Sequence, residues 1–161
     1  MAENIKNLNM AITVDDGSRR VPIQNTRGEE IGAFTLRPTD MGIVQRYNDM
    51  VAQFDAVIEP LQALGEEEGE IDLSDPRYVA AIGEATRRVH DAVNTLFDSD
   101  DAAAAFFGRM NPFSPVDGEF YCAKVLNAVG EYIGQAFETE TAKFSEKAKG
   151  YANRATRRSK K

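Results

Sequence analysis

The sequence predicts an α+β fold, mainly α, with a short N-terminal β-hairpin followed by a small helical bundle. Two short apolar runs flank a turn before residue 38, and long segments with apolar residues at every third or fourth position fill the rest. The 161 residues are 42% hydrophobic and 28% charged, which suits a single globular domain. We expect a β-hairpin region over residues 10–37, a helical bundle over 39–137 and a basic helical tail over 141–161.

The hairpin is predicted from residues 20–24 and 30–37, which flank a polar stretch. Gly28 in that stretch can take a positive φ without steric cost, as a tight connection requires. Pro22 cannot donate to a strand ladder, so its strand is expected at an edge. Residues 11–14 are a further strand candidate ahead of the hairpin.

A long amphipathic helix is predicted after Pro38. Pro38 disfavours helix before it, and Thr39 or Asp40 can cap the helix after it. The apolar stripe of this helix comprises Ile43, Tyr47, Met50, Phe54, Val57, Ile58 and Leu61. Pro60 is expected to kink the helix or to end it early. Residues 65–70 are expected to form a solvated acidic loop.

A second helix is predicted with Ser74 or Asp75 as its cap and Pro76 in its first turn. Its apolar stripe comprises Tyr78, Val79, Ile82, Ala85, Val89, Val93, Leu96 and Phe97. The acidic stretch 98–101 should break the chain. Residues 102–107 then form a short third helix, which Gly108 stops.

The last part of the chain is predicted to hold a loop, a long helix and a helical tail. Residues 109–118 contain two prolines and are expected to be a loop. The helix is expected from about Glu119 to about Phe137, and the tail from Thr141 onward. The stripe of the helix comprises Tyr121, Val125, Val129, Tyr132, Ile133 and Ala136.

The charge is divided unevenly along the chain. Residues 1–142 hold 11 Lys/Arg against 25 Asp/Glu, a net charge of −14, whereas residues 143–161 hold eight basic residues against one Glu, a net charge of +7. The basic residues at the end of the tail are Arg154, Arg157, Arg158, Lys160 and Lys161. Such a split indicates self-contact, a charged partner or a solubilising end. The acidic body would repel a polyanion, so a solvated helix end is favoured over nucleic-acid binding.

The inventory of reactive side chains argues against an enzyme. No Gly-rich phosphate loop, Gly-x-Ser-x-Gly elbow or Glu-x-x-His motif is present. His90 beside Asp91 could act as a general base, but no nucleophile lies within helical reach, which favours a surface histidine. Cys122 is expected to be a buried structural thiol. We therefore expect no catalysis, no metal and no cofactor. No apolar run suits a membrane helix, and the first sixteen residues lack the apolar core of a secretory signal.

Aromatic residues are concentrated in sixteen positions around the Pro-containing loop. Two interpretations of these aromatic residues are open. They form core at a helix corner, or they form an exposed patch that binds an amphipathic helix of a partner. Phe106 and Phe107 lie about 100° apart on a short helix, which cannot easily bury both. We hypothesise a partner groove between the second, third and last helices. Its expected anchors are Phe106, Phe107, Met110, Phe113, Phe120 and Tyr121.

Three stretches between about residues 20 and 158 carry a resemblance to a known family. The first is the β-hairpin that leads into a helix, at 27–32 and 36–40. The second is the series 95–97, 107–108, 111–112 and 118–121, which leads into the last helix. The third is the basic end at 153–158. In these features the chain resembles the tail assembly chaperones of long-tailed bacteriophages and of related prophages in Gram-positive hosts.

The resemblance implies a non-enzymatic function. These chaperones bind the tape measure protein, a very long helical chain, keep it in solution while the tail tube polymerises around it, and then leave. It further implies action in the host cell cytoplasm, absence from the mature virion, and contacts with the tail tube protein and a frameshift-extended form of the same chain. A homo-oligomer is compatible with this function. The end at 159–161 is compatible with the short form.

Two other functions remain open from the residues. One is a small structural virion component, such as a connector or tail-completion protein, which would be found in purified particles. The other is a regulatory or antitoxin-like protein whose basic tail contacts nucleic acid. Binding of that kind would weaken steeply as the salt concentration rises.

Overall fold

The computed structural model describes residues 10–68 and 74–159. The order of its elements is β1 (Arg19–Gln24), β2 (Glu30–Leu36), α1 (Gly42–Glu68), α2 (Pro76–Phe97), α3 (Ala102–Phe107), β3 (Pro115–Val116), β4 (Glu119–Phe120) and α4 (Tyr121–Ser159). The predicted class is confirmed, since a short antiparallel hairpin precedes a set of helices in an α+β, mainly α fold.

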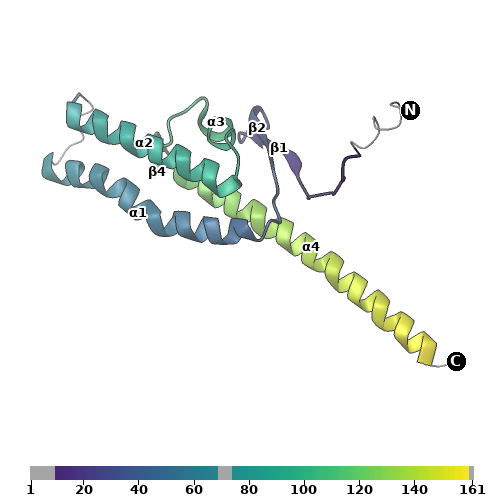
Figure 1. The fold of residues 1–161 in the computed structure, drawn as a ribbon. Coiled ribbons are helices and arrows are strands. Elements are labelled where there is room, and N and C mark those ends of the chain that lie inside the picture. The colour runs from purple at the N-terminus through teal and green to yellow at the C-terminus, as the bar shows by residue number, and fades with distance from the viewer. Residues whose placement is uncertain (1–9, 69–73, 160–161) are drawn as a thin grey trace, which may run out of the picture.

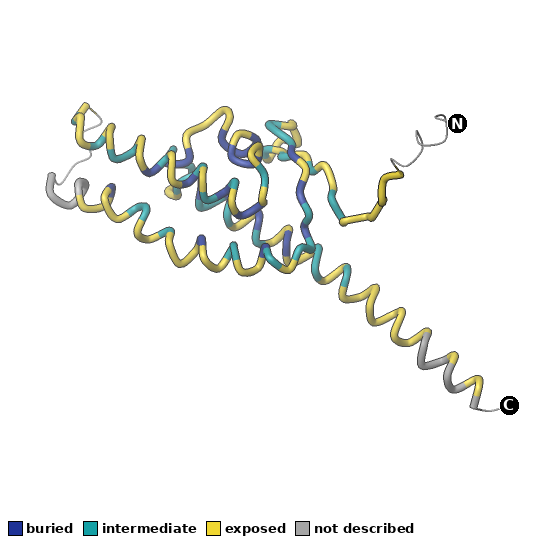
Figure 2. The backbone as a smooth tube through the Cα atoms, in the orientation of Figure 1, coloured by how far each residue is buried: buried dark blue, intermediate teal, exposed yellow. Residues whose placement is uncertain are grey.

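The helices form a body from which one of them projects. In Figure 1, α1 and α2 lie antiparallel and side by side, and α3 and the β1–β2 hairpin cover the end where α2 finishes. α4 begins beside this cover and passes α1, where Gly130 lies against the Tyr47 hydroxyl group. It then continues beyond the body as a single helix (Figure 1). The buried residues in Figure 2 lie where these elements face one another.

The N-terminal hairpin is confirmed. β1 and β2 pair with Val21 opposite Phe34, and Gly28 in the turn has a φ of +78°. The Asn25 side chain accepts the backbone N–H groups of Arg27 and Glu29, which fixes the turn. The additional strand predicted at residues 11–14 is wrong. This segment is exposed, and among the described residues no strand pairs with it, so it is not assigned as a strand.

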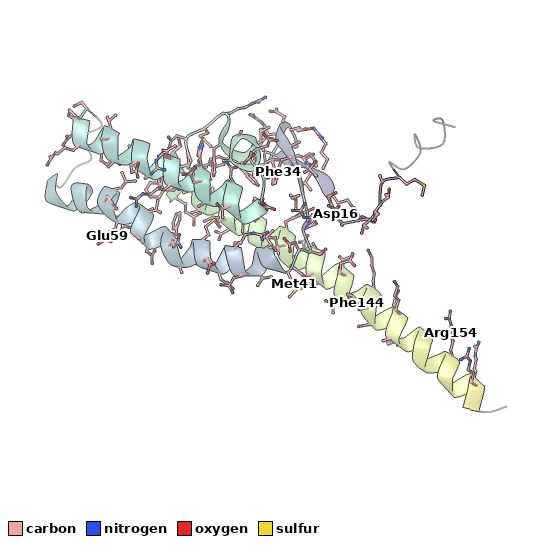
Figure 3. The ribbon with its side chains drawn as sticks, in the orientation of Figure 1. Asp16, Phe34, Met41, Glu59, Phe144 and Arg154 are labelled. Atoms are coloured by element: carbon pink, nitrogen blue, oxygen red, sulfur yellow. The ribbon has the colours of Figure 1, made fainter. Side chains whose placement is uncertain are left out.

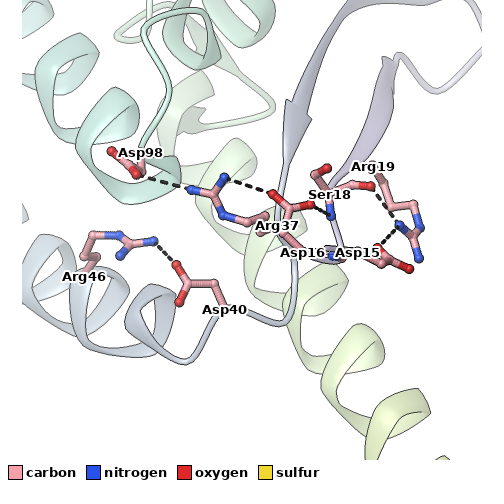
Figure 4. Close-up of polar contacts among 9 residues, drawn as sticks. Asp15, Asp16, Ser18, Arg19, Arg37, Asp40, Arg46 and Asp98 are labelled. Carbon is pink, nitrogen blue, oxygen red and sulfur yellow. Dashed lines mark hydrogen bonds and ion pairs between the residues drawn. The ribbon is translucent and has the colours of Figure 1, made fainter. Parts of the chain in front are cut away.

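The start of α1 is tied to the end of α2. The Asp40 carboxylate accepts the N–H of Gly42 at 3.0 Å and a hydrogen bond from Arg46 at 3.0 Å, so the predicted cap is confirmed at Asp40. Arg46 also donates to the carbonyl oxygen of Leu96 at 2.8 Å. Figure 4 shows this pair beside a second link, in which Arg37 contacts carboxylates on both sides. The hydrogen bonds hold the first turn of α1 against the end of α2.

Replacing Asp40 by alanine is expected to lower the free energy of unfolding by about 1 kcal/mol at pH 7. The hydrogen bond from Arg46, followed by that from the Gly42 N–H, lowers the pKa of Asp40. Its contribution is therefore present above the carboxyl pKa of the unfolded chain and is lost as the pH falls through the lower pKa of the folded state. Urea titrations should show that the difference in free energy of unfolding between the unchanged chain and the Asp40→Ala chain becomes smaller below about pH 4. A gap that widens in acid would contradict this assignment.

α1 does not end at Pro60, so the early end that was one of the two predicted effects of this proline is wrong. The helix runs from Gly42 through Pro60 to Glu68. Pro60 cannot pair with the carbonyl group of Ala56, but both residues are exposed, so water can satisfy that carbonyl. The acidic loop predicted at 65–70 is also partly wrong, because 65–68 belong to the helix. The remainder of that stretch lies outside the described residues.

The predicted limits of α2 and α3 are confirmed. The Asp75 side chain accepts the N–H of Arg77, and Pro76 opens α2. At the other end Asp98 adopts the left-handed conformation with a φ of 49°, which closes the helix. Gly108 follows the last residue of α3. Val79 was predicted on the apolar stripe of α2, but its side chain is exposed.

The predicted loop at 109–118 contains a small hairpin instead of leading directly into a helix. β3 and β4 pair across Asp117 and Gly118, both with positive φ, an Asp-Gly turn of the type that suits two-residue connections. α4 therefore begins at Tyr121 rather than at Glu119. It is one helix of 39 residues, without the predicted break before residue 141. No proline interrupts it.

Candidate partner-binding site

The β3–β4 hairpin brings the predicted aromatic residues together. Phe113 packs edge-on against Phe120 with ring centroids 5.4 Å apart, and Phe107 packs edge-on against Tyr121 at 5.8 Å. The Tyr121 hydroxyl donates to the carbonyl oxygen of Phe106 at 3.0 Å. These contacts join the end of α3 to the start of α4 and gather the five aromatic residues of the predicted set.

The cluster is turned largely inward, contrary to the predicted exposed patch. Phe106, Phe107 and Phe113 are only 8%, 6% and 7% exposed, and Phe120 and Tyr121 are half-buried. Met110 is the only one of the six residues that is exposed, with 36% of its surface accessible. The other explanation, core at a helix corner, therefore holds for the three phenylalanines. Phe106 also packs on Phe34 and Phe97, with ring centroids 5.5 and 5.9 Å away. Partner binding by these six residues stays a prediction.

A cavity of about 510 Å³ lies between α1, α2 and α4. Its apolar lining comprises Met50, Phe54, Ala56 and Val57 of α1, Val89, Ala92, Val93 and Leu96 of α2, Cys122 and Leu126 of α4, and Phe107 of α3. The only member of the predicted anchor set in this lining is Phe107. The predicted groove placed the partner between the second, third and last helices, whereas here α1 supplies one wall.

The mouth of the cavity is charged and exposed. Asp49 and Gln53 of α1 lie on one side, and Arg88 and Asp91 of α2 lie on the other. Arg88 donates to Glu84 at 3.0 Å. Hydrogen bonds from Arg87 and then Arg88 lower the pKa of Glu84 to about 2, so this carboxylate remains ionised at neutral pH. An apolar floor below a charged rim resembles the usual anatomy of a protein-binding patch.

His90 and Cys122 have structural surroundings. His90 is half-buried rather than on the surface as predicted, and its ring stacks on Phe107 with centroids 5.5 Å apart. Cys122 is buried, as predicted, and burial raises its pKa to about 11. The backbone N–H of Cys122 donates to the carbonyl oxygen of Pro112. In the described part of the chain no three His, Cys, Asp or Glu side chains are grouped so that they could hold a metal ion.

The raised pKa of Cys122 predicts that its thiol reacts slowly with thiol reagents. At pH 8 the Cys122 thiol stays protonated and covered, so a thiol reagent should react only after local opening. We expect labelling of the native chain to be slower than labelling in denaturant by roughly two orders of magnitude or more. The measurement is the rate of mass increase with a maleimide. Equal rates in the two conditions would contradict the buried position of this residue.

The predicted basic tail lies on α4 beyond the body. Arg154, Arg157 and Arg158 are exposed there, whereas Lys160 and Lys161 lie outside the described residues. Figure 3 shows Arg154 on the projecting part of the helix, well away from the β-hairpin. The tail and the cavity therefore form separate candidate surfaces.

Within the described ranges, no helix combines the length and apolar character that crossing a membrane requires. A comparison with known protein families, with curated proteins and with solved structures finds no match. The functional argument therefore depends on the geometry of this chain and on the resemblance noted in its sequence.

The residues of α1 that wall the cavity were missing from the predicted site. Met50, Phe54 and Val57 were recognised as part of an amphipathic stripe, but a stripe by itself does not indicate which part of it remains uncovered. No local signal in the sequence marks out the part of the stripe that lines the cavity.

Proposed function

We propose that this chain is a non-enzymatic chaperone that holds a long apolar helix in the cavity between α1, α2 and α4. The partner we propose is the tape measure protein of a phage tail, kept in solution in the host cytoplasm until the tail tube has assembled and then released. The observation that carries the proposal is the cavity itself, about 510 Å³ of space lined by apolar side chains below an exposed charged rim.

The shape of this cavity suits side chains of a helix. An amphipathic helix recognises a groove through apolar anchors at positions i, i+3 or i+4, and i+7. Met50, Phe54 and Val57 have the matching spacing along α1, so they present a row of apolar contacts. Burying such a row removes apolar surface of both chains from water, which favours association.

The rim supports reversible binding. Asp49, Arg88 and Asp91 keep the mouth of the cavity hydrated, and the body as a whole carries a strong negative charge. A partner held chiefly by its apolar face can be displaced when the tail tube offers that face another surface. The resemblance to tail assembly chaperones supports the choice of partner, and the cavity supports the proposed position of its helix.

Filling the cavity should abolish partner binding. Ala92 lines the cavity from α2, and Ala92→Phe would occupy space that the partner needs. We expect the unchanged chain to co-elute with the longest helical protein encoded directly downstream of its gene, and to keep that protein soluble. The Ala92→Phe chain should elute alone and leave the protein insoluble. The measurement is size-exclusion chromatography with light scattering after co-expression.

A matched control uses the same change elsewhere. Ala128 is exposed on α4 and does not line the cavity, so Ala128→Phe should bind as the unchanged chain does. Circular dichroism of both variants checks that the helices remain. Binding that survives Ala92→Phe in a folded chain would remove the cavity from the proposal. Failure of the unchanged chain to bind would remove the chaperone function.

One observation favours the second candidate, a structural virion component. Connectors assemble rings through extended arms, and the projecting part of α4 is such an arm (Figure 1). The two candidate functions differ in whether the protein is present in the finished particle. Mass spectrometry of purified particles should detect many copies of a connector, and none of a chaperone that leaves.

A further inference from the structure

The projecting part of α4 is not covered by any other element in the described part of the chain. Every residue from 141 to 150 is exposed, and Figure 2 shows this stretch as a continuous exposed helix leaving the body. A helix without tertiary packing is marginal in water at this length. Gly150 and Thr156 weaken its propensity further. A helix of this kind gains its stability from a surface that covers it.

One face of this helix is basic with an aromatic residue at its start. Helical spacing places Phe144, Lys147, Arg154 and Arg158 along the same stripe, which we call the tail stripe. Phe144 is 73% exposed, and the three basic residues are exposed as well. Within the described ranges, none of these three has an ion-pair partner. The tail stripe therefore offers both apolar surface and free positive charge.

α1 carries a complementary stripe on its outer side. Val44, Val51, Asp55 and Glu59 follow one another along this face, which we call the α1 stripe. All four are exposed, and Val51 is 48% exposed although it is a large apolar residue in mid-helix. The two carboxylates have no ion-pair partner within the described ranges. Arg46 is the only basic residue of α1, and Asp40 already holds it.

The two stripes match when the helices run parallel. Phe144 precedes Arg154 by ten residues and Arg158 by fourteen; Val44 precedes Asp55 by eleven and Glu59 by fifteen. With Phe144 beside Val44, each arginine therefore lies beside a carboxylate, within one residue of register. An antiparallel pairing would place the arginines against the valines instead. The parallel pairing brings apolar groups together and places Arg154 and Arg158 beside Asp55 and Glu59.

We propose that the tail stripe docks on the α1 stripe of a second copy of this chain. The tail cannot reach its own α1 stripe, because α1 and the projecting part of α4 leave their crossing point in opposite directions (Figure 1). In Figure 3, Glu59 and Arg154 accordingly lie far apart on opposite sides of this crossing. A two-fold rotation near the crossing brings each tail parallel to α1 of the other copy, so the exchange is reciprocal and closes as a dimer. This inference does not rest on the proposed function.

The test is a charge exchange across the two stripes, read by sedimentation and light scattering. The unchanged chain should be a dimer, with twice the 17.8 kDa mass of a single chain, and the dimer should dissociate as the salt concentration rises. Arg154→Glu together with Arg158→Glu should raise the dimer Kd by roughly tenfold or more. Adding Asp55→Arg and Glu59→Arg to that chain restores opposite charges, so the dimer should return.

The control carries the same change of charge outside the tail stripe. Lys149→Glu with Arg157→Glu should leave the dimer intact, since neither residue belongs to the stripe. The proposal is overturned if the unchanged chain is monomeric, if the Arg154/Arg158 variant dimerises as well as the unchanged chain, or if the charge exchange fails to restore the dimer. A monomeric chain whose tail instead binds duplex DNA, and loses that binding in the Arg154/Arg158 variant, would assign the tail stripe to nucleic acid.

Discussion

Replacing Phe34 by alanine is expected to lower the free energy of unfolding by about 3–5 kcal/mol, because a large buried ring is lost and a void remains. Phe34 is buried, and its ring packs edge-on against Phe97 at 5.0 Å and Phe106 at 5.5 Å. It thereby joins β2 to the end of α2 and to α3. The measurement is urea unfolding followed by circular dichroism.

The neighbouring position provides the control. Thr35 lies on the same strand but is exposed, so Thr35→Ala should change the stability by less than about 0.5 kcal/mol. If Phe34→Ala proved equally mild, the hairpin would not be anchored through this ring. A loss confined to the hairpin, with the helices retained to the same urea concentration, would show that the two parts unfold separately.

Replacing Gly32 by alanine is the second change with a large expected effect. A Cβ atom at this position would meet the backbone of Ala105 in α3, with the carbonyl carbon only 2.9 Å away. Backbone atoms inside a helix cannot move aside cheaply, so the hairpin must shift away from α3. We expect a loss of about 1–3 kcal/mol or more, although only one methyl group is added.

The same substitution at Gly83 should act in the opposite direction. Gly83 lies within α2, and a Cβ atom there would meet no atom within 4 Å. Gly83→Ala should therefore raise the free energy of unfolding by about 0.5–1 kcal/mol through helix propensity. Thermal unfolding of the two variants side by side gives the sign of each effect. A destabilising Gly83→Ala, or a neutral Gly32→Ala, would contradict the packing of these elements.

Local signals were sufficient to predict most of the elements. The cap at Asp75 and the turn at Gly28 each depend on one residue and its immediate neighbours, so the sequence predicts them well. The early end predicted at Pro60 was wrong because the cost of a proline in a helix depends on whether water reaches the carbonyl group that loses its partner. That access depends on the packing of α1, which a local pattern does not contain.

The candidate site was less predictable than the fold. A run of aromatic residues indicates that apolar surface will be covered, but it does not indicate whether core or partner covers it. For Phe106 the cover proved to be Phe34 and Phe97, which are distant in sequence. The cavity is lined by residues of α1, α2, α3 and α4 that are distant in sequence. Such a space belongs to the tertiary arrangement and has no local signature.

The continuity of α4 joins two distant regions mechanically. At about 1.5 Å per residue, its 39 residues make a rod of roughly 58 Å without an internal hinge of proline. Cys122 and Leu126, which wall the cavity, and Arg154, near the far tip, belong to this same rod. The cavity wall and the basic tail therefore lie on one continuous helix, so a movement of α4 as a single unit would displace both regions together.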